Sequence, residues 1–121
     1  MKLQLLSQQF TVCKLKSAQN INPDGGILFY AVTDEEISLV CETMRAPSNT
    51  LEREDGWRGF RITGTLDFSL IGILSEISAI LADNNIGIFV VSTYNTDYIL
   101  VKEQNIEKAV KSLSEKGYDW I

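Results

Sequence analysis

The sequence contains no histidine, and so lacks the side chain most often used as a general base near neutral pH and as a metal ligand. Its two cysteines, Cys13 and Cys41, lie in strand-like runs and make a poor zinc site without histidine. We expect two buried free thiols, with a disulfide as the alternative. A glycine-rich phosphate loop and a nucleophile motif are also missing. These absences argue against an enzyme, and no metal or cofactor is expected.

Basic residues are scarce, because 11 lysines and arginines stand against 16 aspartates and glutamates, which gives a net charge of −5. Nucleic-acid and anionic-membrane binders need a basic surface, so we expect neither nucleic acid nor membrane as a partner. No apolar run approaches the roughly 20 residues that cross a bilayer, and the start of the sequence does not resemble a signal peptide. We therefore expect a cytoplasmic protein.

The second half of the chain has the clearer pattern of helices and strands. Apolar residues recur at three- and four-residue spacing within 70–81 and 106–113, which predicts two amphipathic helices. Strands are predicted at 57–66, 86–92, 97–102 and 118–121. The order β-α-β-β-α-β predicts a ferredoxin-like α+β fold, in which both helices cover one face of a four-stranded antiparallel sheet.

The first half is rich in strands and shows no convincing amphipathic helix. Strands are predicted at 10–15, 27–33 and 37–42. A loop containing proline and glycine is predicted at 17–26, and a polar connection at 45–56. Such a module would bury too little surface to be stable alone, so we expect it to pack on, or extend, the second sheet.

Several short motifs point to a known family. They are "GIL" at the start of the first helix, "LADNNIGIF", "STYNTDYILV" and, upstream, "TDEEISLVCE". Residues 56–118 resemble an ACT domain, the small regulatory module of amino-acid metabolism. The motifs are similar to those of small bacterial tandem-ACT proteins, the ACT repeats of aspartate kinases and the cytosolic arginine sensors of animals. The resemblance implies a reduced, strand-rich ACT-like module at 1–56 and an ACT domain at 57–121.

The resemblance also implies a ligand site, with an amino acid held between two ACT modules. The matching ligand-binding positions are Ser38, Leu39, Asp67, Gly72, Ile73, Leu74, Thr93, Tyr94, Thr96 and Asp97. A helix N-terminus suits the ligand's carboxylate, and Asp97 suits its ammonium group or a cationic side chain. Simpler roles stay open, because Asp67 could be only an N-cap, Asp97 only a turn residue, and Gly72 only a relief of crowding.

Together these features predict a non-catalytic amino-acid sensor that forms a homodimer and acts on a regulated protein partner. The alternative is a protein-interaction domain whose ligand pocket is vestigial. An enzyme and an RNA-binding module of the same topology are disfavoured by the missing motifs and by the negative charge. The identity of the bound amino acid is left open.

Overall fold

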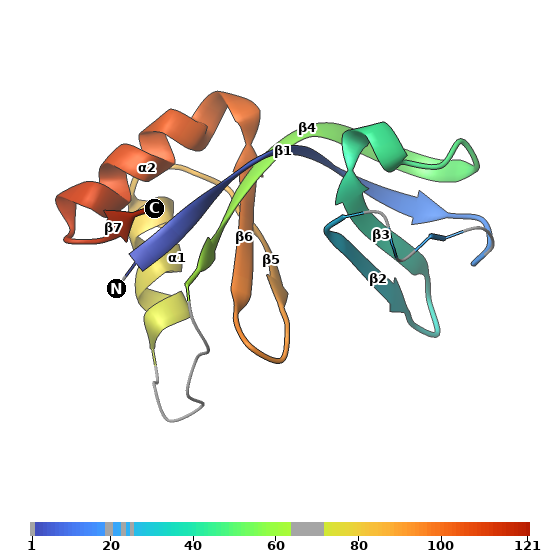
Figure 1. The fold of residues 1–121 in the computed structure, drawn as a ribbon, viewed down its shortest axis with the longest axis horizontal. Helices are drawn as coiled ribbons and strands as arrows, with labels where there is room; N and C mark the ends of the chain where they lie inside the picture. Colours follow the sequence, from blue (N-terminus) through green and yellow to red (C-terminus); the bar gives the residue numbers. More distant parts are fainter. Residues whose placement is uncertain (1, 19–20, 23, 25, 64–71) are drawn as a thin grey trace. The chain divides into compact units, whose positions relative to one another are not determined.

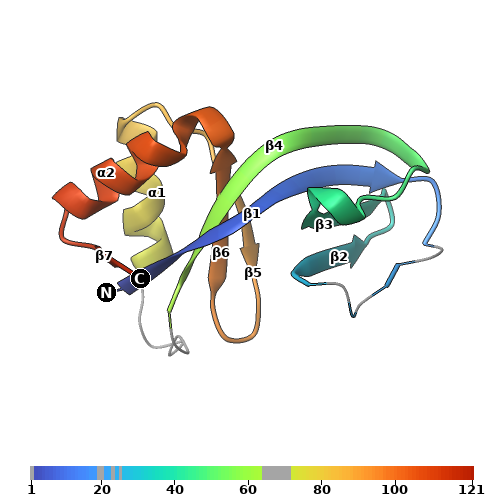
Figure 2. The ribbon, with the colours of Figure 1, turned by 45° about the horizontal axis from the view of Figure 1, so that its top comes forward.

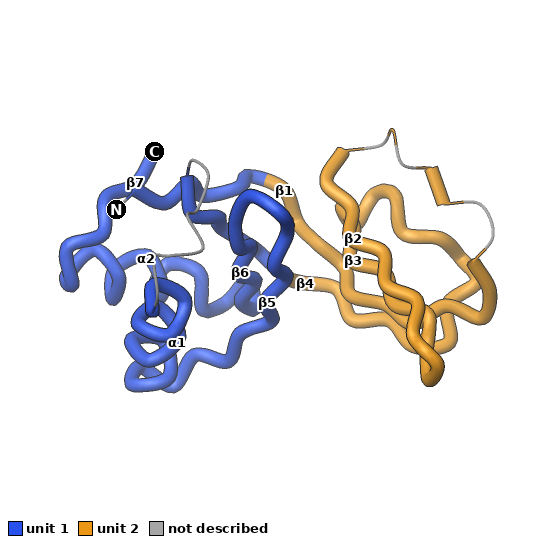
Figure 3. Tube along the Cα trace, turned by 90° about the horizontal axis from the view of Figure 1, so that it is seen from below, with its two compact units in different colours: residues 1–7, 58–121 blue, residues 8–57 orange. Residues whose placement is uncertain are grey.

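The computed structural model describes residues 2–18, 21–22, 24, 26–63 and 72–121 (Figure 1). The chain divides into two compact units, which Figure 3 shows in different colours. Unit 1 comprises Met1–Ser7 with Arg58–Ile121, and unit 2 comprises Gln8–Trp57. Two long strands, β1 (Lys2–Leu15) and β4 (Thr50–Ile62), each run through both units. Residues 1–7 therefore belong to the same unit as residues 58–121.

Unit 1 has the α+β fold that its apolar periodicity predicts. After β4 come α1 (Ile73–Asp83), β5 (Phe89–Ser92), β6 (Asp97–Lys102), the short 3-10 helix η2 (Glu103–Asn105), α2 (Ile106–Glu115) and β7 (Asp119–Trp120). This is the ferredoxin-like β-α-β-β-α-β order, and β6 has the predicted bounds. The helix predicted over 70–81 begins at Ile73 in the described part of the chain.

The sheet of unit 1 differs from the predicted four antiparallel strands, and that prediction was wrong. Its strand order is β7-β1-β4-β6-β5, so the start of β1 adds a fifth strand between β4 and β7. β1 pairs with β7 in parallel, with Lys2 opposite Asp119 and Leu3 opposite Trp120. Burial of Leu3, whose side chain is fully inaccessible, favours this insertion.

Both helices of unit 1 cover one face of its sheet, and their apolar stripes form the core with the strands (Figure 1). The buried members of this core are Leu3, Phe60, Ile62, Ile77, Ile80, Leu81, Ile86, Ile99, Val101, Ile106, Ala109, Leu113 and Tyr118. Because strand side chains alternate between faces, the residues between these strand positions lie on the other face of the sheet.

A hydrogen bond between Tyr118, which follows α2, and Glu76 in α1 makes the free energy of unfolding fall at alkaline pH. The buried Tyr118 hydroxyl donates to Glu76 Oε1 at 2.7 Å, and burial together with this bond raises the pKa of Tyr118 from 10.0 to about 12. The folded pKa lies above the unfolded one, so this contribution is complete below pH 10 and is lost as the pH rises towards 12.

Between these two pH values, the wild type should lose about 2 kcal/mol more unfolding free energy than Tyr118→Phe, which cannot ionise at this position. Urea unfolding of both proteins at several pH values measures the difference. Parallel pH profiles for the two proteins would contradict the assignment to Tyr118.

Unit 2 is a strand-rich module without a long helix in its described part. It contains β2 (Leu28–Val32), β3 (Ile37–Glu42) and the short η1 (Thr43–Arg45), with strand order β2-β3-β1-β4. The polar connection predicted at 45–56 was wrong from residue 50 onwards, because Thr50 begins β4. Pairing with β1 overrides the low strand propensity of this charged stretch, and Thr11 Oγ1 donates to Asp55 Oδ1 at 2.6 Å.

The core of unit 2 contains both cysteines as free thiols. Cys13 and Cys41 are buried with Leu15 and Leu39. Burial raises the pKa of both thiols, that of Cys41 to about 11, which keeps them protonated and unreactive near neutral pH.

The two units contain matching hairpins. β3 begins at Ile37 and β6 at Asp97, which is 97 − 37 = 60 residues later, and both strands show the same sequence of half-buried and buried positions. The preceding turns also match, because the N–H of Thr33 donates to the Glu36 carbonyl (2.9 Å) as that of Thr93 donates to the Thr96 carbonyl (2.8 Å). A 3-10 helix follows each hairpin. The structure therefore contains the same local motif twice.

Candidate functional site

The turn between β5 and β6 contains three of the residues that the sequence assigns to the ligand, and a fourth, Asp97, is the first residue of β6. Besides the backbone bond already described, Thr93 Oγ1 donates to the Thr96 carbonyl oxygen at 3.0 Å. Ser92 Oγ donates to Asp97 Oδ1 at 2.5 Å. The hydroxyl groups of Ser92 and Thr93 thus hold the turn at the end of this hairpin, and the turn forms without a glycine.

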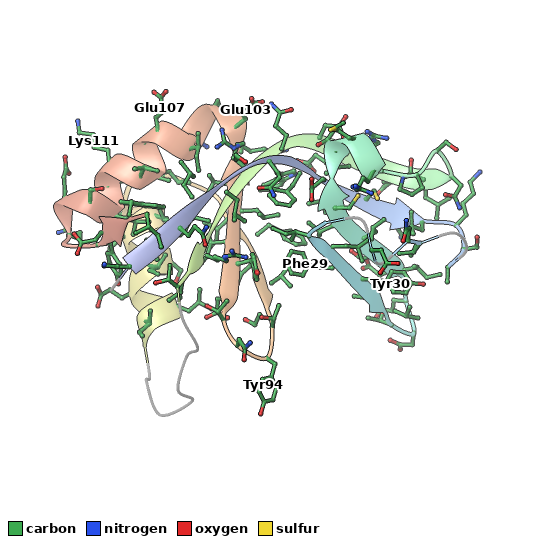
Figure 4. The ribbon with its side chains drawn as sticks, viewed as in Figure 1. Phe29, Tyr30, Tyr94, Glu103, Glu107 and Lys111 are labelled. Atoms are coloured by element: carbon green, nitrogen blue, oxygen red, sulfur yellow. The ribbon has the colours of Figure 1, made fainter. Side chains whose placement is uncertain are left out.

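Thr96 fixes this turn to the neighbouring strand. Its side chain is buried, and its Oγ1 donates to the carbonyl oxygen of Ile62, the last residue of β4, at 2.8 Å. The hydroxyl of Thr96 therefore has a structural partner, and it positions the turn beside the end of β4. Tyr94 is 85% exposed at the tip of the turn, where Figure 4 shows its ring directed away from the strands.

Gly72 precedes the first residue of α1 in a left-handed conformation, with φ of 93°. A Cβ placed there would meet no heavy atom of the described residues within 4 Å, so backbone conformation rather than crowding favours glycine. The carbonyl of Gly72 accepts the N–H of Glu76 at 2.8 Å, and no side chain of the described residues caps this end of the helix. The N–H groups of this first turn give the N-terminus of α1 a partial positive charge, which favours an anion.

Asp97 lies on the same face of the sheet as α1. Every second side chain of a strand lies on the same face, so Asp97 shares its face of β6 with Ile99 and Val101, which pack into the core beneath both helices. Figures 1 and 2 show the β5–β6 turn and the start of α1 at the same end of unit 1. A carboxylate and a helix N-terminus thus share one end and one face of this unit.

The remaining sequence candidates fall elsewhere. Ile73 and Leu74 are half-buried and pack against the core of unit 1, so their side chains have a structural role. Ser38 and Leu39 lie in β3 of unit 2, where Ser38 is half-buried and Leu39 is part of the core. Asp67 lies outside the described residues.

Sequence reasoning missed a row of polar residues on the other face of the unit 1 sheet. Arg61 in β4 donates through Nε to Gln4 Oε1 in β1 at 3.0 Å, and through Nη1 to the Tyr98 hydroxyl in β6 at 2.9 Å. The alternation of Phe60, Arg61 and Ile62 predicts that Arg61 lies on the wetter face of its strand, but it does not reveal the partners of Arg61 on the neighbouring strands.

Within the part of the chain that the structure describes, no group of three or more histidine, cysteine, aspartate or glutamate side chains could hold a metal ion. Within the same residues, no helix is long and apolar enough to cross a membrane.

Comparison with known proteins identifies relatives of the whole chain. It is 31% identical to the Agobacterium tumefaciens protein Atu0741, with 99% of this chain and 91% of that chain covered and a TM-score of 0.86. The Vibrio cholerae protein VC0802, of unknown function, is 20% identical, with 92% and 85% covered and a TM-score of 0.77. The second resemblance shows a shared fold.

The third comparison is with an enzyme that contains a similar fold. The allosteric aspartate kinase of Clostridium acetobutylicum is 20% identical, with 87% of this chain and 32% of that chain covered and a TM-score of 0.64. The chain thus corresponds to about a third of that enzyme. A family model described as the ACT domain matches residues 52–115, more than half of the chain. The chain belongs to the ACT domain family, whose members are regulatory modules.

Proposed function

We propose that this protein is a non-catalytic regulator that binds a free amino acid, with part of the site formed by the N-terminus of α1 and the carboxylate of Asp97. The observation that carries the proposal is their shared position at one end and on one face of unit 1. A free amino acid has an anionic carboxylate and a cationic ammonium group. The helix N-terminus complements the carboxylate, and Asp97 complements the ammonium group.

The α1 N-terminus would bind the carboxylate of the ligand. The first turn of any helix has N–H groups without intrahelical partners, and among the described residues no side chain caps those that follow Gly72. Asp97 would bind the ammonium group, since its carboxylate has further acceptor positions besides the one that Ser92 Oγ occupies. The tip residues Thr93 and Tyr94 would contact the rest of the ligand.

Regulation would follow from a shift between conformations. The family resemblance suggests that the amino acid is held between two ACT modules. A ligand that contacts both modules in one arrangement stabilises that arrangement by its difference in affinity. We propose that this change acts on a protein partner or on a homodimer.

A second candidate is a protein-interaction domain that no longer binds an amino acid. The specific observation in its favour is that Thr93, Thr96 and Asp97 are all hydrogen-bonded within the turn or to β4. Such a turn is stable without a ligand. The two candidates differ in whether any amino acid stabilises the fold.

Thermal unfolding in the presence of each common amino acid separates these candidates. A ligand present at 100 times its Kd should stabilise the folded chain by about 2.7 kcal/mol, which raises the Tm of a domain of this size by roughly 10 °C. We expect one amino acid, or one chemical class, to produce such a shift at millimolar concentration. If none raises the Tm, the interaction domain is the better description.

A further inference from the structure

The sheet face opposite the helices of unit 1 contains a fixed cation. Three adjacent strands, β1, β4 and β6, place Gln4, Arg61 and Tyr98 side by side, and the two bonds from Arg61 hold its guanidinium group between the other two. The guanidinium carbon also lies 5.7 Å from the centre of the Tyr98 ring. These contacts fix the orientation of Arg61 without using all five of its N–H donors.

Among the described residues, no acidic side chain forms an ion pair with Arg61. Both of its hydrogen-bond partners, the Gln4 amide oxygen and the Tyr98 hydroxyl, are neutral acceptors. The side chain is only half-exposed, so water solvates it less well than it would a free arginine. A guanidinium group in this setting gains strongly from an oxyanion, which can accept two parallel N–H bonds.

An open depression of about 350 Å³ lies beside Arg61. Its described lining consists of Gln4, Arg61, Ile62, Thr63, Thr93, Asn95, Thr96, Tyr98 and Ile121. Arg61 is the only charged side chain in this set. The threonine hydroxyls already donate to backbone carbonyls, so they offer an anion few donors. The exposed side-chain amide of Asn95 supplies a further donor at the rim.

We propose that this depression is a binding site for a small oxyanion, such as an organic carboxylate, and that Arg61 is the main residue that binds it. Its main residue, Arg61, lies on the opposite face of the sheet from Asp97, so the depression shares only the tip residue Thr93 with the amino-acid site proposed above. Gln4 and Tyr98 act as positioning residues that hold the guanidinium group, and Asn95 contributes at the edge. The proposal does not depend on whether an amino acid binds near α1.

Nitrogen-15 NMR titration tests this site directly. The labelled protein is titrated with succinate and, separately, with inorganic phosphate, at constant ionic strength. We expect saturable shifts of the Arg61 Nε–H signal and of the Asn95 side-chain amide. The tighter of the two probes identifies the class of anion, carboxylate or phosphate. The absence of a saturable shift with both probes would overturn the proposal.

Two variants test the role of the charge. Arg61→Gln removes the cation and should weaken binding by about tenfold or more, the usual cost of losing a hydrogen bond to a charged group. Arg58→Gln is the matched control, because Arg58 lies in the same strand and donates to the Leu6 carbonyl at 3.0 Å but does not line the depression.

Arg58→Gln and Asp97→Asn should both retain binding, and the second result separates this site from the amino-acid site. Equal affinity in the wild type and Arg61→Gln would refute the assignment. If Arg61→Gln fails to fold, Arg61→Lys and the Arg61 Nε–H shift of the wild type provide the answer. An Arg61 signal that does not respond to either probe would then reject the site.

Discussion

Replacing Asp97 with alanine is expected to remove amino-acid binding while the chain stays folded. The carboxylate would be the partner of the ligand's ammonium group, and losing one member of such a charged pair costs about 2–5 kcal/mol, or roughly 30- to several-thousand-fold in Kd. The fold should survive, because the one partner described for this carboxylate is the Ser92 hydroxyl at a half-exposed position. Calorimetric titration with the amino acid identified by thermal unfolding measures the loss.

Asp83→Ala is the matched control for this experiment. Asp83 is an exposed aspartate in the last position of α1, at the opposite end of the helix from Gly72, so its loss should leave the Kd within about twofold. The thermal unfolding curve of each variant without ligand checks the fold. An unchanged Kd for Asp97→Ala would show that Asp97 is only a turn residue.

Phe60→Ala should produce the largest loss of stability. The Phe60 side chain is fully buried in the core of unit 1, and its ring packs edge-to-face on Trp120, with ring centres 5.2 Å apart. Truncation leaves a cavity and removes the aromatic contact, which should lower the free energy of unfolding by about 3–5 kcal/mol. This is a large fraction of the roughly 5–15 kcal/mol typical of a domain. Urea unfolding measures the change.

Two other variants show whether the loss at Phe60 comes from the cavity. Phe60→Leu keeps most of the buried volume and should cost less than Phe60→Ala, about 1–2 kcal/mol. Met44→Ala removes a side chain that is 96% exposed and should change stability by less than about 0.5 kcal/mol. Equal effects of alanine and leucine at position 60 would contradict a packing role.

The sequence was sufficient to predict those elements whose residues have a local periodic pattern. The bounds of β3 and β6 were predicted to the residue, and both helices of unit 1 follow their apolar stripes. The first half of β1 and the first half of β4 were missed, because polar residues dominate both stretches. Both form strands through pairing with partners distant in the sequence, which leaves no local signal.

The site was predictable to a similar degree. Family resemblance pointed to the turn containing Asp97 and to the glycine before α1, and the structure explains the glycine by its positive φ. It could not show that Thr96 bonds to β4, because this contact joins residues 34 positions apart. Arg61 was missed because its partners come from two other strands, and only the assembled sheet brings these together.

The position of β1 has a consequence for how the chain folds. Lys2 pairs with Asp119, across 119 − 2 = 117 residues of sequence, and unit 2 is inserted between the two parts of unit 1. During synthesis, the first strand emerges from the ribosome early and cannot meet β7 until residue 119 has been added. The strands of unit 2 are continuous in sequence, so they can begin to pair before that. The sheet of unit 1 therefore closes late, and such long-range pairing makes folding slow.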